Sequence, residues 1–106
     1  MDKKAVIKII RRFRDSLEKQ GILIDKIILY GSYLAGNYHY GSDIDLVIVS
    51  PSFEGKAMLE RVDILTDSIF EVLAPIEAVA LTPIEWDCKK FMVAEFAQNG
   101  EVVTNS

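Results

Sequence analysis

The stretch from Tyr30 to Leu46, YGSYLAGNYHYGSDIDL, is the most informative part of this chain. It joins two runs that read as β-strands, 26–30 and 44–49, through a polar and glycine-rich segment. If the second run is extended, Asp43 and Asp45 point to the same face, because side chains alternate along a strand with a period of two. Their Cα atoms would lie about 6.6 Å apart. At that separation two carboxylates can share hard cations such as Mg²⁺, and a bound metal is the simplest reason to tolerate two like charges.

Size and composition limit the setting of this motif. The chain has 106 residues, half of them hydrophobic, which suits one domain spanning 1–106. The single cysteine, Cys88, excludes an internal disulfide and a cysteine-rich zinc site, so a reducing cytoplasm is the expected compartment. The apolar residues within 5–10 are too few for a signal peptide, and no run approaches the ~20 apolar residues of a membrane span. We therefore expect a soluble cytoplasmic protein with no membrane partner.

The charge is unevenly distributed along the chain. The net charge of −4 argues against non-specific binding of nucleic acid by the whole surface, so nucleic acid is considered only as an acceptor. Eight of the twelve Lys and Arg residues nevertheless lie between Lys3 and Lys26. Two interpretations stay open for this basic end: a solvated helix face, or a surface for a phosphate-bearing or acidic partner.

Hydrophobic periodicity predicts the remaining elements. An amphipathic helix is expected at 3–20, ending near Gly21, and a second at 55–73 that should lie on the sheet. The apolar positions of the second helix are Met58, Leu59, Val62, Leu65, Ile69, Val72 and Leu73. Between Pro75 and Thr82, residues 76–81 read as a strand that places Glu77, Val79 and Leu81 on one face.

Capping signals set the ends of two further helices. Thr82, Pro83 and Glu85 form a capping-box pattern that predicts a third helix over 83–98. Ser32 can cap a short helix through Ala35, and 101–104 is either an edge strand or loose. The order is α-β-β-α-β-α. We expect an α/β (α+β) fold, with a small mixed sheet and helices packed on one face.

The combination of Gly31-Ser32, ten intervening residues and Asp43-Ile44-Asp45, each motif bounded by the expected strand, resembles the nucleotidyltransferase superfamily typified by DNA polymerase beta. More narrowly, the chain resembles the minimal nucleotidyltransferases, small proteins often encoded beside a helical HEPN partner. The resemblance covers nearly the whole chain. Its specific content is confined to 30–46, with weaker support from 76–81.

The resemblance implies a role for each motif residue. Gly31 and Ser32 would hold the triphosphate at a helix N-terminus, although Ser32 acting only as a cap stays open. Asp43 and Asp45 would bind two Mg²⁺ ions. The third carboxylate of the family is typically Asp on the next strand, and this sequence has Glu77 there. Glu77 is thus either a metal ligand or general base, or a polar residue on the open face of the sheet.

These roles imply an enzyme that transfers a nucleoside monophosphate, AMP from ATP being the first candidate, to an acceptor hydroxyl. The chain is barely large enough for a catalytic core. The acceptor could therefore lie on another subunit, such as a HEPN-like helical protein, or the chain could form a homodimer. The alternative is a non-catalytic antitoxin or assembly module that masks such a partner, and the glutamate at position 77 keeps it open.

Overall fold

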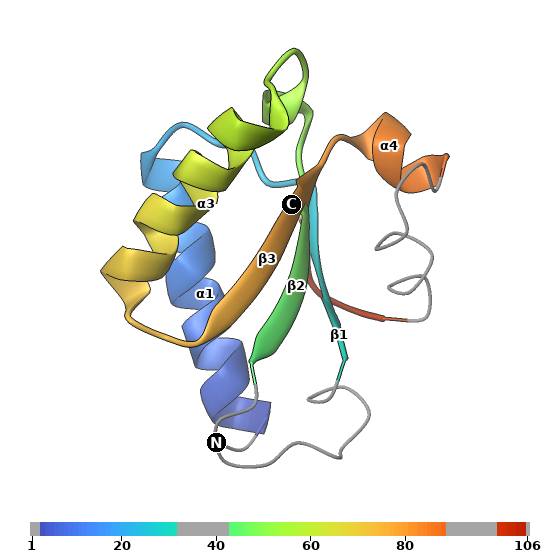
Figure 1. Ribbon diagram of the computed structural model, residues 1–106. Helices are drawn as coiled ribbons and strands as arrows, with labels where there is room; N and C mark the ends of the chain where they lie inside the picture. The colour runs from blue at the N-terminus through green and yellow to red at the C-terminus, as the bar shows by residue number, and fades with distance from the viewer. Residues whose placement is uncertain (1–2, 32–42, 89–99, 106) are drawn as a thin grey trace.

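The computed structural model describes residues 3–31, 43–88 and 100–105 (Figure 1). The elements in chain order are α1 (Lys3–Lys19), β1 (Lys26–Tyr30), β2 (Ile44–Val49), the 3-10 turn η1 (Pro51–Phe53), α3 (Met58–Val72), β3 (Ile76–Leu81), α4 (Pro83–Asp87) and β4 (Glu101–Asn105). The three predicted strands are confirmed, and the tail forms a strand. The short helix predicted from Ser32, and the part of the third helix beyond Cys88, lie outside the described residues.

The sheet has the strand order β3-β2-β1-β4. Strand β1 runs antiparallel to both β2 and β4, whereas β2 and β3 are parallel. The C-terminal end of β1 therefore lies beside the N-terminal ends of β2 and β3. This arrangement brings the two halves of the 30–46 motif to one edge of a small mixed sheet.

The core has two parts, one on each face of the sheet. Helices α1 and α3 lie on one face (Figure 1), where Ile44, Leu46 and Ile48 of β2 join the larger hydrophobic cluster. The opposite face holds a smaller cluster of Ile28, Val47, Val49, Leu81 and Trp86. Trp86 belongs to α4, so the expectation of helices on one face holds for α1 and α3, while α4 packs against the other. Asp45 lies between Ile44 and Leu46, so it points to the face of the smaller cluster.

Helix α3 forms as predicted, but the sequence pattern does not identify its buried face. Of the predicted apolar positions, Leu65 and Val72 are buried, whereas Met58, Leu59, Val62 and Leu73 are exposed. Arg61 and Ser68 are buried in their place. These polar side chains can be buried because each has partners: Ser68 accepts a hydrogen bond from Ser16 of α1 at 2.9 Å and another from Gln20 at 2.8 Å.

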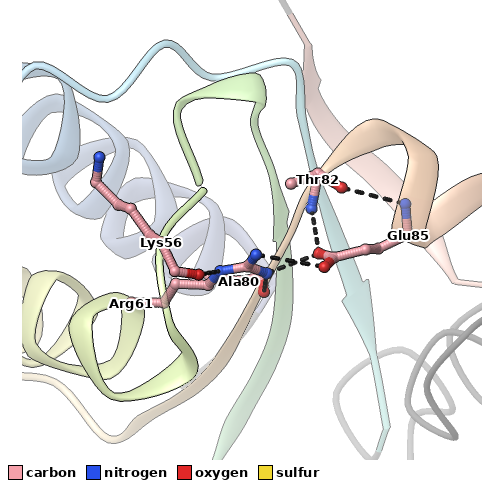
Figure 2. A network of polar contacts seen from close by, with 5 residues as sticks. All are labelled: Lys56, Arg61, Ala80, Thr82 and Glu85. Carbon is pink, nitrogen blue, oxygen red and sulfur yellow. Dashed lines mark hydrogen bonds and ion pairs between the residues drawn. The ribbon is translucent and has the colours of Figure 1, made fainter. Parts of the chain in front are cut away.

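Arg61 joins α3 to the junction between β3 and α4 (Figure 2). Its guanidinium forms an ion pair with Glu85, with Nη1 2.6 Å from Oε1 and Nη2 3.3 Å from Oε2. It also donates to the carbonyl oxygens of Ala80 (3.2 Å) and Lys56 (3.1 Å). Glu85 accepts from the backbone N–H of Thr82 at 2.8 Å, which completes the predicted capping box. One carboxylate thus caps α4 and neutralises a buried cation, and the hydrogen bond from Arg61 lowers the pKa of Glu85.

Within the described residues, no helix combines the length and the apolar character that crossing a bilayer requires.

Candidate active site

Three neighbouring strands bring charged and aromatic side chains together at one edge of the sheet. Asp45, the second residue of β2, pairs with Tyr30 of β1 on one side and with Glu77 of β3 on the other. Residues in register on adjacent strands present their side chains to the same face, so all three share the face of the smaller cluster. Asp43 directly precedes β2 and is exposed, as is Glu77, whereas Asp45 and Tyr30 are half-buried. The predicted position of Glu77 beside the aspartates is thus supported by the strand register.

The electrostatics of this edge show that the carboxylates interact. The pKa of Asp45 is raised from its usual 3.8 to about 6. Burial is the main cause, followed by a hydrogen bond with Glu77 and by the negative charges of Glu77 and Asp43. The pKa of the Tyr30 hydroxyl is raised as well, by burial and then by the charges of Asp45 and Glu77, so Tyr30 stays neutral. Among the described residues, no Lys or Arg forms an ion pair with Asp43, Asp45 or Glu77.

Gly31 makes room for the carboxylate of Asp45. Its φ angle of +77° lies in the left-handed region that favours glycine. A Cβ atom placed on Gly31 would overlap an oxygen of Asp45 and lie 3.0 Å from its Cγ. The backbone after β1 therefore packs directly on the acidic residue. Any residue with a Cβ atom at position 31 would therefore displace the Asp45 carboxylate or the backbone beside it.

The sequence profile of the nucleotidyltransferase domain matches residues 7–99, which is most of the chain. The chain belongs to the nucleotidyltransferase domain family. No protein with a curated function matches the sequence closely enough to count as a relative.

Solved structures agree with this family assignment. A structure provisionally assigned as a nucleotidyltransferase is 30% identical, with a TM-score of 0.53, and the match covers 76% of this chain and 86% of the other. A protein from Sulfolobus solfataricus with the same provisional assignment is 18% identical, with a TM-score of 0.63 and coverage of 77% and 71%. A toxin–antitoxin structure with AMP-PNP is 17% identical, with a TM-score of 0.62 and coverage of 89% and 72%. At such low identities the last two support the fold alone.

The carboxylates of this nucleotidyltransferase domain suit a magnesium ion, although they do not enclose one. In the part of the chain that the structure describes, no three His, Cys, Asp or Glu side chains gather into a ready-made metal site. Mg²⁺ does not require such a cage, because it keeps several waters and is usually bound by one or two carboxylates together with substrate phosphates. The hard oxygen donors of Asp45 and Glu77, with Asp43 beside them, meet that requirement. The cost of holding these negative charges together would fall when a cation binds.

Tyr30 is the site residue that sequence reasoning did not assign. It stands directly before Gly31 and two strands away from Glu77, and its ring packs against the cluster that contains Trp86. The alternation of β1 could have revealed it, because Ile28 and Tyr30 must share a face once β1 pairs with β2. Ser32, the predicted phosphate ligand, lies outside the described residues.

Gly31→Ala is expected to lower nucleotidyl transfer at least about 100-fold, because displacing a catalytic group by about 1 Å can cost that much. The left-handed backbone adds a stability cost of about 1–2 kcal/mol for any residue with a Cβ. Gly21→Ala is the matched control, since Gly21 has φ +88° but nothing within 4 Å of its added Cβ. Melting temperatures and kcat would be measured for both variants. Equal losses of activity would show that Gly31 acts through backbone strain alone.

Proposed function

We propose that this domain transfers a nucleoside monophosphate from a nucleoside triphosphate, ATP foremost, to a hydroxyl group on a partner protein. The observation that carries the proposal is the meeting of Asp45 and Glu77 across β2 and β3, with Asp43 adjacent and Gly31 packed against Asp45. The family assignment supports a transferase. The reaction would take place in the cytoplasm, where nucleoside triphosphates are available and Cys88 stays reduced.

The reaction joins the acceptor oxygen to the α-phosphorus and breaks the bond from that phosphorus to the bridging oxygen, so that pyrophosphate leaves. Asp43 and Asp45 would hold two Mg²⁺ ions with Glu77 as a third ligand, and these ions would neutralise charge on the attacking and leaving oxygens. Gly31 and Ser32 would position the triphosphate through backbone N–H groups and the serine hydroxyl. Glu77, which is more exposed than Asp45, would accept the proton of the attacking hydroxyl.

The described elements and one structural neighbour support the proposed acceptor. The described residues form a single sheet with its covering helices, and none of these elements extends beyond the site to bind an acceptor. A toxin–antitoxin structure with AMP-PNP is among the neighbours. We therefore propose that a hydroxyl of a helical, HEPN-like partner receives the nucleotide, with a second copy of the chain or an RNA end as competing acceptors.

Label transfer tests the reaction. The protein would be incubated with α-labelled ATP, Mg²⁺ and each acceptor class in turn: a co-expressed helical partner, the protein itself, and RNA. The expected result is labelling of the partner protein with release of pyrophosphate, which stops on addition of EDTA. Label that appears in RNA alone would show that RNA, and not a partner protein, is the acceptor. Absence of label from every acceptor, with pyrophosphate release also absent, would contradict a transferase.

A non-catalytic role is the second candidate, because apolar side chains of α3 are exposed, as expected for a surface that covers a partner. If the protein acts by masking, it should still neutralise its partner after Asp43 and Asp45 are both replaced by Asn. If it acts as an enzyme on that partner, the same double substitution should abolish neutralisation. Growth of cells that express the partner toxin with either form of the protein distinguishes the two functions.

A further inference from the structure

Helix α3 carries a line of large apolar side chains on a face that the rest of the described structure does not cover. Leu59 is 79% exposed, Val62 51%, Phe70 71% and Leu73 83%. At 100° per residue, Leu59, Val62 and Phe70 fall within an arc of about 80°. The buried residues of the helix point about 130° away from this arc. We call these four residues the α3 stripe.

The backbone at Leu73 gives a second, independent indication. Leu73 is the C-cap of α3 and adopts the left-handed conformation, with φ 55° and ψ 49°. Of the described residues, it alone has a positive φ without being glycine. Glycine or asparagine is favoured at such helix ends, since a Cβ atom makes this conformation costly. Leucine here adds strain and exposes an apolar side chain to water, and packing against the described residues offsets neither cost.

The charges beside the stripe limit what can cover it. Glu60, Asp63 and Asp67 are exposed and lie between about 40° and 100° around the helix, directly beside the stripe. None of them forms an ion pair with a described residue. The helix has one basic residue, Arg61, and it is buried in its pair with Glu85. On α3 itself, the exposed charges beside the stripe are therefore all negative. We call these three residues the acidic row.

This charge pattern disfavours two of the three possible occupants. In an antiparallel pair of α3 helices from two copies of the chain, the acidic rows would face each other and repel. An anionic membrane surface would repel them as well. A partner helix with apolar residues along one face and Lys or Arg beside them would match both the stripe and the acidic row.

We propose that the α3 stripe and the acidic row bind an amphipathic, basic helix of a partner protein. The stripe runs from residue 59 to residue 73, about 21 Å along the helix axis, so it accommodates a partner helix of about four turns. Helix α3 lies beside α1 on the face of the sheet opposite α4 (Figure 1), whereas Asp45 points to the face that α4 covers. A partner could therefore dock there without covering the edge that holds Asp45. The inference does not depend on the proposed transferase activity.

A designed helix tests the surface without knowledge of the natural partner. The probe is a fluorescein-labelled 18-residue peptide with leucines at i, i+3 and i+4 spacing and lysines beside them. A second peptide carries glutamates in place of the lysines. Fluorescence anisotropy at low and moderate salt would measure binding. We expect the lysine peptide to bind at least about 10-fold more tightly than the glutamate peptide, and its affinity to fall as salt rises.

Substitutions locate the binding. Phe70→Ser should weaken the lysine peptide at least about 10-fold, whereas Leu23→Ser, at a 64% exposed leucine outside α3, should leave it unchanged. Asp63→Lys with Asp67→Lys should reverse the preference toward the glutamate peptide. Leu73→Gly should raise the melting temperature by a few degrees and still weaken binding, a combination that a purely structural leucine would not produce.

Three outcomes would overturn the proposal: failure of the lysine peptide to bind, binding that survives Phe70→Ser, and a wild-type dimer in sedimentation that Phe70→Ser dissociates. The last would assign the stripe to a second copy of the chain. Asp45→Asn separates this inference from the transferase, since it should bind the peptide like the wild type. Peptide binding without label transfer would support the proposed docking surface and contradict the proposed transferase activity.

Discussion

Asp45→Asn is expected to abolish nucleotidyl transfer and, in the same protein, to raise the stability of the nucleotide-free domain at neutral pH. Activity should fall by at least about 1,000-fold, because the change removes the charge of the carboxylate that we propose as a metal ligand. The gain in stability comes from the same charge. Asp45 is held beside Glu77 and Asp43, and its pKa of about 6 lies above its usual 3.8.

The pH dependence follows from the sign of this shift. Between about pH 4 and pH 6 the folded protein binds more protons at Asp45 than the unfolded chain does, so stability decreases as pH rises through this range. The full loss of stability caused by ionised Asp45 is present above its raised pKa of about 6 and disappears below its usual pKa of 3.8. Its upper limit is about 3 kcal/mol. Water around a half-buried carboxylate reduces this to about 1–2 kcal/mol. Asparagine avoids the penalty at every pH.

Thermal unfolding at pH 7.5 and pH 4 measures the effect. At pH 7.5 the Asp45→Asn protein should melt about 4–8 °C above the wild type, since about 1 kcal/mol corresponds to that shift in a domain of this size. At pH 4 the difference should vanish. Asp25→Asn, at an exposed aspartate at the other end of β1, is the control and should change neither curve. A variant that is less stable than the wild type at pH 7.5 would show that the carboxylates do not repel.

Adding Mg²⁺ together with a non-hydrolysable nucleotide tests whether a bound cation relieves the repulsion at Asp45. Both should stabilise the wild type, because a cation at Asp45 and Glu77 offsets their repulsion and ligand binding favours the folded state. The Asp45→Asn protein should gain much less. Equal stabilisation of the two proteins would place the metal elsewhere.

The strands of the site could be predicted from the sequence because each one is a short apolar run bounded by turn residues. The β2 strand places Asp45 by alternation alone, and the resemblance of the 30–46 motif pointed to Glu77 on the neighbouring strand. The register between β2 and β3 was not predictable, since it depends on how α3 crosses from one strand to the next. Only the structure sets Glu77 opposite Asp45 rather than two residues away.

Helix α3 shows where periodicity is insufficient. Its sequence has apolar residues on two faces. The spacing of these residues does not identify which face packs against the sheet and which face stays exposed. The choice depends on partners distant in sequence: Ser16 for Ser68, and Glu85 for Arg61. Arg61 reads as a surface residue in sequence because burial of a charge requires a partner that the helix itself does not contain. Leu73 likewise reads as core, although it is 83% exposed.

Arg61→Ala is expected to be the most destabilising single substitution considered for this fold, costing about 3–5 kcal/mol. The arginine is 6% exposed and binds Glu85 through both terminal nitrogens. Its removal leaves the Glu85 carboxylate partly buried without its cation, and it leaves the carbonyl oxygens of Ala80 and Lys56 without their donors. Both consequences cost free energy because they leave partly or fully buried polar groups without a hydrogen-bond partner from the protein.

Urea unfolding at pH 7 measures this cost, and Lys19→Ala provides the contrast. Lys19 and Glu71 form an exposed ion pair at 3.7 Å, which should contribute less than about 1 kcal/mol. The cost of Arg61→Ala should also shrink in acid. Arg61 lowers the pKa of Glu85, so the stability from this pair is present above the usual carboxylate pKa and is lost as pH falls through the lowered value.

A double substitution separates the ion pair from the packing of its members. Glu85→Gln keeps the side chain that caps Thr82 but removes the charge, which leaves Arg61 as an unpaired buried cation. The double variant Arg61→Met/Glu85→Gln removes both charges and keeps most of the volume. Its loss of unfolding free energy should be at least about 2 kcal/mol smaller than the sum of the losses for Arg61→Met alone and Glu85→Gln alone. If the costs instead add, Arg61 stabilises the fold through its stem and its contact with the Phe53 ring, 6.0 Å from the guanidinium carbon, rather than through Glu85.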